Sequence, residues 1–86
     1  HMDQSPKTMK SEELSSGMAT RLGIDLTQAY SNTSDIGVLA LQGVVRRCAG
    51  CTEHETCAKL QAENDTLEQA PSYCRNKALF ERLIRR

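Results

Sequence analysis

The sequence predicts an all-α protein, a small single domain of about four or five short helices around a four-cysteine site. Apolar residues recur every three or four positions, as they do along one face of a helix. No segment shows the sustained alternation of apolar and polar residues that is typical of a half-buried strand. A chain of 86 residues is also too short to bury two separate cores. We therefore expect one helical domain, at residues 11–86.

The first ten residues are polar and are expected to form a disordered N-terminal segment, residues 1–10. Within this segment we interpret His1 and Met2 as the remnant of a cleaved tag.

The first helix is predicted from Ser11, which is a favourable N-cap residue. Leu14, Met18 and Leu22 recur every four residues and form one face of this helix. Gly23 follows them and can adopt the left-handed conformation that ends a helix. A further short turn of helix is expected within residues 24–30.

The next helix is predicted to be capped by Ser34 or Thr33 and to end near the first cysteine. Thr52 and Glu55 have the spacing of a capping box, so a third helix is expected to start there and to end around Asn64. Asn76 is expected to cap the last helix. The apolar stripe of that helix comprises Leu79, Phe80, Leu83 and Ile84.

The cysteines are the candidate site. They follow the pattern C-x2-C-x5-C-x16-C, and none lies outside it: Cys48, Cys51, Cys57 and Cys74. Each is predicted at or near a helix end, so the fold can bring all four to one place. A small core with one phenylalanine and no tryptophan is expected to be only marginally stable by itself. A bound metal or disulfides between the cysteines would stabilise it.

Three arginines lie next to these cysteines in the sequence, at Arg46, Arg47 and Arg75. Positive charge and helix N-termini lower the pKa of a thiol and favour the thiolate that binds metals. We therefore expect the cysteine pKa values to be lowered.

The cysteine pattern is compatible with three states of the site: an iron–sulfur cluster, a zinc ion, and disulfides or free thiols. Structural zinc sites usually use two closely spaced pairs of ligands, and here the second pair is 16 residues apart. Iron–sulfur clusters accept more varied spacings, often a compact group of cysteines and a distant fourth. We expect a [4Fe-4S] cluster first, with structural zinc and with disulfides or free thiols as the alternatives.

The compact triplet C-x2-C-x5-C with one remote cysteine resembles the ligand pattern of two sensor families, the FNR-type regulators and the WhiB-like proteins. This resemblance implies a [4Fe-4S] centre that is sensitive to oxygen or nitric oxide.

A longer resemblance covers most of the chain from Met18 onward. It is carried by residues 22–26 (LGIDL), 47–51 (RCAGC), Cys57, 71–76 (PSYCRN) and 79–83 (LFERL). On these residues the chain resembles a family of small bacterial proteins defined by a domain of unknown function, number 6455. The resemblance implies that the four cysteines act together, and it carries no activity.

Other functions find less support in the sequence. His54 lies among acidic residues and is expected to be exposed to solvent rather than to bind a metal. The residues form no Cys–His–acid arrangement and no phosphate-binding glycine loop, so we expect no enzyme. A thiol oxidoreductase is the weakest alternative, because its Cys-x-x-Cys motif normally opens a helix beside strands.

The expected partner is a protein. Contact with nucleic acid would have to use the arginines of the last helix, which are Arg82, Arg85 and Arg86. A net charge of zero and only three aromatic residues give such contact weak support. No apolar run is long enough to cross a membrane and no signal peptide opens the chain, so we expect a cytoplasmic protein. Its function is then that of a non-enzymatic, redox- or gas-responsive interaction module. The alternative is an interaction domain stapled by zinc or disulfides.

Overall fold

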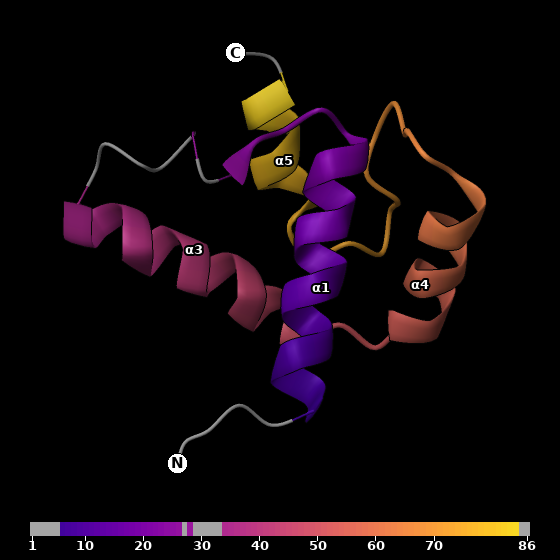
Figure 1. Ribbon diagram of the computed structural model, residues 1–86, viewed down its shortest axis with the longest axis horizontal. Coiled ribbons are helices and arrows are strands. Elements are labelled where there is room, and N and C mark those ends of the chain that lie inside the picture. Colours follow the sequence, from indigo (N-terminus) through magenta and orange to yellow (C-terminus); the bar gives the residue numbers. More distant parts are fainter. Residues whose placement is uncertain (1–5, 27, 29–33, 85–86) are drawn as a thin grey trace.

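The computed structural model describes the backbone of residues 6–26, 28 and 34–84. Within these ranges the chain forms helices joined by turns and loops, and no strand, so the all-α prediction is confirmed. The helices are α1 (Pro6–Arg21), α3 (Ser34–Ala49), α4 (His54–Glu63) and α5 (Lys77–Ile84). Helix α1 packs against both α3 and α4, which lie on opposite sides of it (Figure 1).

Helix α1 begins at Pro6, five residues before the predicted start. The disorder expected for residues 1–10 is therefore wrong for residues 6–10, and residues 1–5 lie outside the described ones. Proline is well tolerated in the first helical turn, where its missing N–H would have no partner in any case. Ser11 is consequently not an N-cap. It is fully buried inside the helix, where its carbonyl accepts a 2.7 Å hydrogen bond from Ser15 Oγ.

The C-terminal end of α1 confirms the role predicted for Gly23, which has a φ of 80°. The amide of Gly23 donates to the carbonyl of Thr20 at 3.0 Å, and the amide of Ile24 donates to the carbonyl of Ala19 at 2.8 Å. These two hydrogen bonds form a Schellman motif, which satisfies carbonyls that the helix end would otherwise leave free. The helical turn expected within residues 24–30 falls partly on residues outside the described ones.

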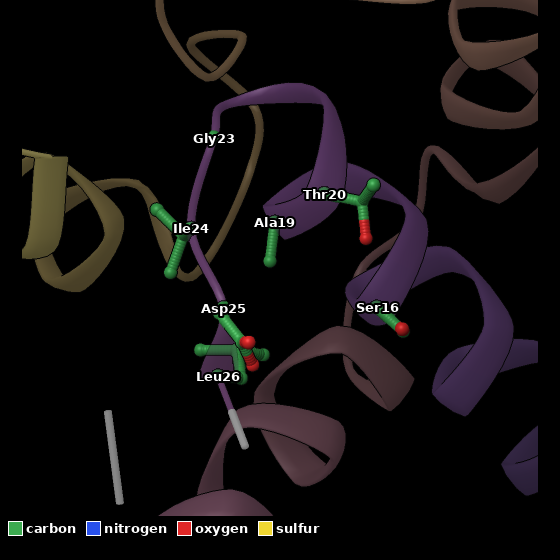
Figure 2. A pocket seen from close by; sticks show the side chains of 7 residues that line it. All are labelled: Ser16, Ala19, Thr20, Gly23, Ile24, Asp25 and Leu26. Atoms are coloured by element: carbon green, nitrogen blue, oxygen red, sulfur yellow. The ribbon is translucent and has the colours of Figure 1, made fainter. Parts of the chain in front are cut away.

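A pocket of about 430 Å³ lies beside this turn (Figure 2). Ser16, Ala19 and Thr20 line it from α1, and the residues from Gly23 to Leu26 line it from the chain that follows. Its one titratable side chain is Asp25, and no cysteine lines it. It is therefore separate from the cysteine site.

The core lies between α1 and the other helices. Its two largest fully buried side chains are Phe80 and Met18. Leu79 and Leu83 pack against this core as predicted, but Ile84 is 40% exposed and faces solvent. The buried apolar residues are Leu14, Met18, Ala19, Leu22, Ile24, Val44, Cys57, Ala70 and Phe80.

Helices α1 and α4 approach closely at Gly17. A Cβ at this position would overlap with Oε1 of Gln61 on α4. The Arg21 guanidinium closes the same junction, because its Nε lies 3.0 Å from the carbonyl oxygen of Gln61 and 2.7 Å from that of Asn64. The glycine is thus required by tertiary contact.

Helix α5 begins directly after Asn76 as predicted, but the capping bonds predicted for α4 and α5 need correction. Glu53 is the N-cap residue of α4 and makes no side-chain capping bond, so the capping box predicted at Thr52 is wrong. Asn76 does precede α5, but its side chain bonds to α3: Nδ2 donates to the carbonyl of Val44 at 3.0 Å, and Oδ1 accepts from Arg47 at 2.7 Å. At Asn76, partners on α3 thus replace the local cap.

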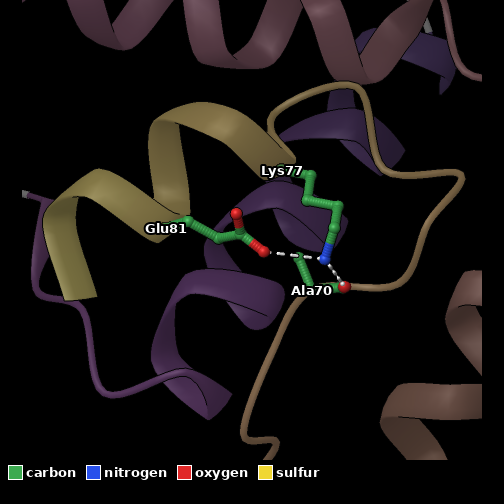
Figure 3. A network of polar contacts seen from close by, with 3 residues as sticks. All are labelled: Ala70, Lys77 and Glu81. Atoms are coloured by element: carbon green, nitrogen blue, oxygen red, sulfur yellow. Dashed lines mark hydrogen bonds and ion pairs between the residues drawn. The ribbon is translucent and has the colours of Figure 1, made fainter. Parts of the chain in front are cut away.

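The loop before α5 is attached to that helix by Lys77 (Figure 3). Its Nζ donates to the carbonyl of Ala70 at 2.7 Å and pairs with Glu81 at 2.9 Å. This attachment fixes the path of the loop that carries the last cysteine.

Candidate functional site: the four-cysteine cavity

The structure brings all four predicted cysteines to one small cavity of about 20 Å³. Cys48 comes from the last turn of α3, Cys51 from the turn after it, Cys57 from α4, and Cys74 from the loop before α5. All four are free thiols; Cys57 is buried and the other three are half-buried. The remaining lining residues are Leu14, Ser15, Met18, His54, Tyr73, Arg75, Asn76 and Phe80.

Each cysteine sulfur has one hydrogen-bond donor. The Ser11 hydroxyl bonds to Cys48 and the Asn76 backbone N–H bonds to Cys74. The remaining two donors are the Glu53 backbone N–H, 3.3 Å from Cys51 Sγ, and Gln61 Nε2, 3.4 Å from Cys57 Sγ. A neutral thiol is a weak acceptor, whereas a thiolate is a strong one. The donor set therefore suits four anionic sulfurs.

Gln61 is held in place for this role. Its Nε2 also donates to the carbonyl of Leu14 at 2.9 Å, and its Oε1 lies 3.4 Å from Nη1 of Arg21. The Arg21–Gln61 pair thus connects the end of α1 to the buried sulfur of Cys57.

Burial raises the pKa values of Cys48, Cys57 and Cys74, contrary to the sequence prediction. It raises the pKa of Cys48 to about 11, and the nearby charges of Cys57, Cys51 and Cys74 add to the effect. Burial is also the main cause that raises the pKa values of Cys57 and Cys74. The charges of the other three sulfurs therefore disfavour the ionisation of Cys48, whereas the hydrogen-bond donors of Cys48, Cys57 and Cys74 act in the opposite direction.

The neighbouring arginines are not among the causes that lower the pKa values of Cys48, Cys57 and Cys74, although Arg75 lines the cavity. Arg46 and Arg75 are exposed, and Arg47 donates to Asn76. The cations that do oppose the effect of burial are Arg21 at Cys57 and Lys77 at Cys74.

His54 is half-buried, so the expectation of solvent exposure is wrong. Its Nε2 lies 2.7 Å from the carbonyl oxygen of Cys48. A carbonyl only accepts, so this nitrogen carries the proton and donates. The bond ties the start of α4 to the end of α3, across the turn that holds Cys51.

Tyr73 is the residue before Cys74, and its hydroxyl is an exception. Among the described residues, Tyr73 Oη is the one buried side-chain nitrogen or oxygen without a hydrogen-bond partner. Burial, and then the charges of Cys57, Cys51 and Cys74, raise the pKa of this hydroxyl. Its oxygen therefore lies near the sulfurs that surround the cavity.

The donor chemistry fits a thiolate-bound metal group, but the geometry is not that of a finished metal site. In the part of the chain that the structure describes, no three His, Cys, Asp or Glu side chains are already placed to hold a metal ion. A space of about 20 Å³ is about the room that one water needs. A cluster of four irons and four sulfides would require the cysteines to move apart. Only Cys57 lies in the interior of a helix, so the segments that carry the other three can adjust.

The basic residues predicted for nucleic acid contact do not form a described surface. Arg82 is exposed on α5, and Arg85 and Arg86 lie outside the described residues. Of the helices that the structure describes, none has both the length and the apolar character needed to cross a lipid bilayer.

Several residues of the site were not identified from the sequence. Gln61 follows Cys57 by four residues and so shares its helix face, which is a readable signal. No sequence pattern indicated that Ser11 and Arg21 belong to the site, because they reach it from α1, far away in the sequence. Tyr73 gave only its position beside Cys74.

The comparisons with known proteins agree with this picture of one four-cysteine domain. A model of the family of unknown function DUF6455 matches residues 2–86, which is nearly the whole chain. Neither the curated proteins nor the solved structures gave a significant match. With its family model covering the helices and all four cysteines, the chain belongs to the DUF6455 family.

Proposed function

We propose that the protein binds a [4Fe-4S] cluster through Cys48, Cys51, Cys57 and Cys74 and acts as a non-enzymatic, redox- or gas-responsive regulatory module. The observation that carries this proposal is the lining of one cavity by four free thiols, each with its own hydrogen-bond donor. Such donors stabilise anionic sulfur, and hydrogen bonds to sulfur are among the factors that set the reduction potential of a cluster.

When bound, the cluster would supply a centre that changes oxidation state and reacts with oxygen or nitric oxide. The protein's own part is to hold four thiolates in a largely apolar pocket formed by Leu14, Met18 and Phe80. Cys48, Cys51 and Cys74 are each half-buried, so small molecules can reach the sulfurs from outside.

The same site joins the ends of three helices, which gives a route from the occupant to the fold. Cys48 ends α3, Cys57 belongs to α4, and Cys74 precedes α5. Loss of the occupant would leave one buried and three half-buried thiols with no common centre, and the ends of these helices would lose that connection. Metal binding energy would in this way become folding energy.

We propose a protein partner for this module and a cytoplasmic location. Leu39 on α3 is 63% exposed and Ile84 on α5 is 40% exposed, so both apolar side chains are accessible to a partner. Free cysteine thiols persist in reducing compartments, which favours the cytoplasm.

A zinc-stapled interaction domain is the second candidate, and the small size of the cavity favours it. About 20 Å³ suits a single ion better than a cluster, so zinc would need less movement of the four cysteines.

The test is the visible absorption spectrum of protein purified without oxygen, together with iron, sulfide and zinc analysis. The expected result is a brown protein with a broad visible absorption band and with about four irons and four sulfides per chain. The Cys57→Ser protein serves as the control and should be colourless. A colourless wild-type protein with about one zinc per chain would replace the cluster by the second candidate.

A further inference from the structure

Cys48 and Cys51 lie at the two ends of one hydrogen-bonded turn. The amide of Cys51 donates to the carbonyl of Cys48 at 3.0 Å, which closes the turn at the end of α3. The Cα atoms at the two ends of such a turn are less than about 7 Å apart. Disulfides join cysteines whose Cα atoms are about 4.4–6.8 Å apart. The backbone of this turn is therefore compatible with a disulfide as it stands.

The side chains of these two cysteines face the same space. Both line the cavity of about 20 Å³, so both lie on the inner side of the turn. This space has about the room that one water needs, so a small displacement brings two neighbouring sulfurs into contact. Both cysteines are free thiols and half-buried, which leaves them accessible to a small molecule from solvent.

The other two cysteines of the cavity are less suited to forming a disulfide. Cys57 is buried, so an oxidant in solvent does not reach its sulfur. Cys74 is half-buried, but it belongs to the loop before α5, which Lys77 attaches to that helix. A bridge to Cys74 would have to draw two separate segments together across the cavity, whereas Cys48 and Cys51 already share one turn.

We infer that Cys48 and Cys51 form a reversible disulfide in the metal-free protein, by exchange with a low-molecular-weight disulfide such as oxidised glutathione. The thiolate of one cysteine attacks a sulfur of the oxidant, which forms a mixed disulfide and releases one glutathione thiolate. The thiolate of the other cysteine then attacks the bridged cysteine sulfur and releases the second glutathione. Two cysteine thiols are oxidised, one glutathione disulfide is reduced to two thiols, and the two cysteine protons pass to the leaving thiolates.

This disulfide goes beyond the proposed function, because it needs no cluster. Metals bind cysteine in its thiolate form, and a disulfide between Cys48 and Cys51 removes two of the four thiolates. Oxidation and binding of an occupant therefore exclude each other at this site. The cysteine site is in this way responsive to redox conditions even when it is empty.

The test is thiol–disulfide exchange of the chelated and reduced protein in glutathione buffers, followed by alkylation and mass spectrometry. Two of the four thiols should be lost, with a fall in mass of two hydrogens per chain. Cleavage after Glu53 separates the pair from Cys57 and Cys74. The fragment with Cys48 and Cys51 should be bridged and unalkylated, and the fragments with Cys57 and Cys74 should be alkylated.

Single substitutions provide the controls. Cys48→Ser and Cys51→Ser should each stop at one glutathione adduct, because the thiol for the second step is missing. Cys74→Ser is the matched control, since it also removes a half-buried thiol of the cavity but leaves the pair intact. It should be bridged to the same extent as the wild type. The fragment analysis of the wild-type protein decides the pairing even where a variant does not fold.

The outcomes separate this inference from the proposed function. Four alkylated cysteines at every glutathione ratio would overturn the disulfide, and so would a bridge from Cys48 or Cys51 to Cys57 or Cys74. The same yield of the Cys48–Cys51 bridge in concentrated urea would also overturn it, because the folded turn would then play no part. A colourless wild-type protein would overturn the proposed cluster and leave this disulfide unaffected.

Discussion

The two regions in which α1 meets α4 and the following loop are stabilised differently. At the C-terminal end of α1, the Arg21 guanidinium bonds to the carbonyls of Gly17, Gln61 and Asn64, and the carbonyl of Arg21 accepts from Leu67 at 2.8 Å. In the middle of α1, Leu14 and Met18 face the cysteine cavity. There, Gln61 Nε2 donates to the carbonyl of Leu14 and to neutral sulfur at Cys57, and one buried hydroxyl among the described residues has no partner.

The difference shows which part of the fold the chain completes by itself. At the Arg21 junction, the backbone carbonyls at the ends of α1 and α4 accept hydrogen bonds from donors of the protein itself. The cavity collects four thiols, of which Cys48, Cys57 and Cys74 have raised pKa values, around a space of about 20 Å³. We therefore expect the Arg21 junction to persist without an occupant and the cavity to depend on one.

The largest expected effect is that of Cys57→Ser, which should abolish cluster or zinc binding. Three thiolates leave an open coordination position, and a hydroxyl is a poor ligand for a soft-ligand site. Metal analysis and the visible spectrum measure the loss. Thr56→Ser, at the exposed neighbouring position, is the control and should keep full occupancy. A Cys57→Ser protein with its full metal content would mean that Cys57 only packs the core.

The same variant also tests the disulfide alternative. If the cysteines form two disulfides, Cys57→Ser frees one partner thiol and leaves the other bridge intact. Counting reactive thiols in the unfolded protein, with and without reductant, would then give one thiol before reduction and three after it.

The second effect is the loss of stability when the occupant is removed. Structural metal sites contribute about 10 kcal/mol or more in small domains, so chelation with reduction should lower the melting temperature strongly. Amide hydrogen exchange should accelerate in residues 50–57 and 71–76, around the cavity, and change least at residues 21–24. Unchanged helicity and an unchanged melting temperature would show that the apolar core suffices alone.

A glycine pair tests the α1–α4 junction. Gly17→Ala should lower the free energy of unfolding by about 1–3 kcal/mol, because the new methyl group collides with Gln61 and displaces the donor of Cys57. Gly43→Ala on α3 is the matched control. Its methyl group would meet Arg47 at an ordinary 3.5 Å, so the better helix propensity of alanine should raise stability by about 0.5–1 kcal/mol. Urea unfolding measures both, and equal effects would refute the close approach at Gly17.

The smallest effect is an alkaline loss of stability in the metal-free protein. The pKa of Cys48 rises on folding from 9.0 to about 11, so the folded chain keeps a proton that the unfolded chain loses in this interval. The contribution is fully present below pH 9 and is lost as the pH rises towards 11. After a discount for the partial exposure of Cys48, it amounts to about 1 kcal/mol. The urea midpoint should therefore fall as the pH rises from 9.0 to about 11, and less steeply in Cys48→Ala.

The sequence by itself determined the helical class, the end of α1 at Gly23 and the set of cysteines that come together. These features follow from local causes: the four-residue recurrence of Leu14, Met18 and Leu22, and the left-handed conformation that glycine adopts without strain. Such causes act over a few residues, so they can be read before the chain is folded.

Only the tertiary structure decided how the cysteine site is built. Arg21 reaches carbonyls 40 and 43 residues away, and Asn76 bonds to a carbonyl 32 residues away and not to its own helix. Burial likewise raised the cysteine pKa values that nearby arginines were predicted to lower. The reason is that hydrogen-bond partners and desolvation depend on which helix faces meet, and no local pattern records how α1 crosses α3 and α4.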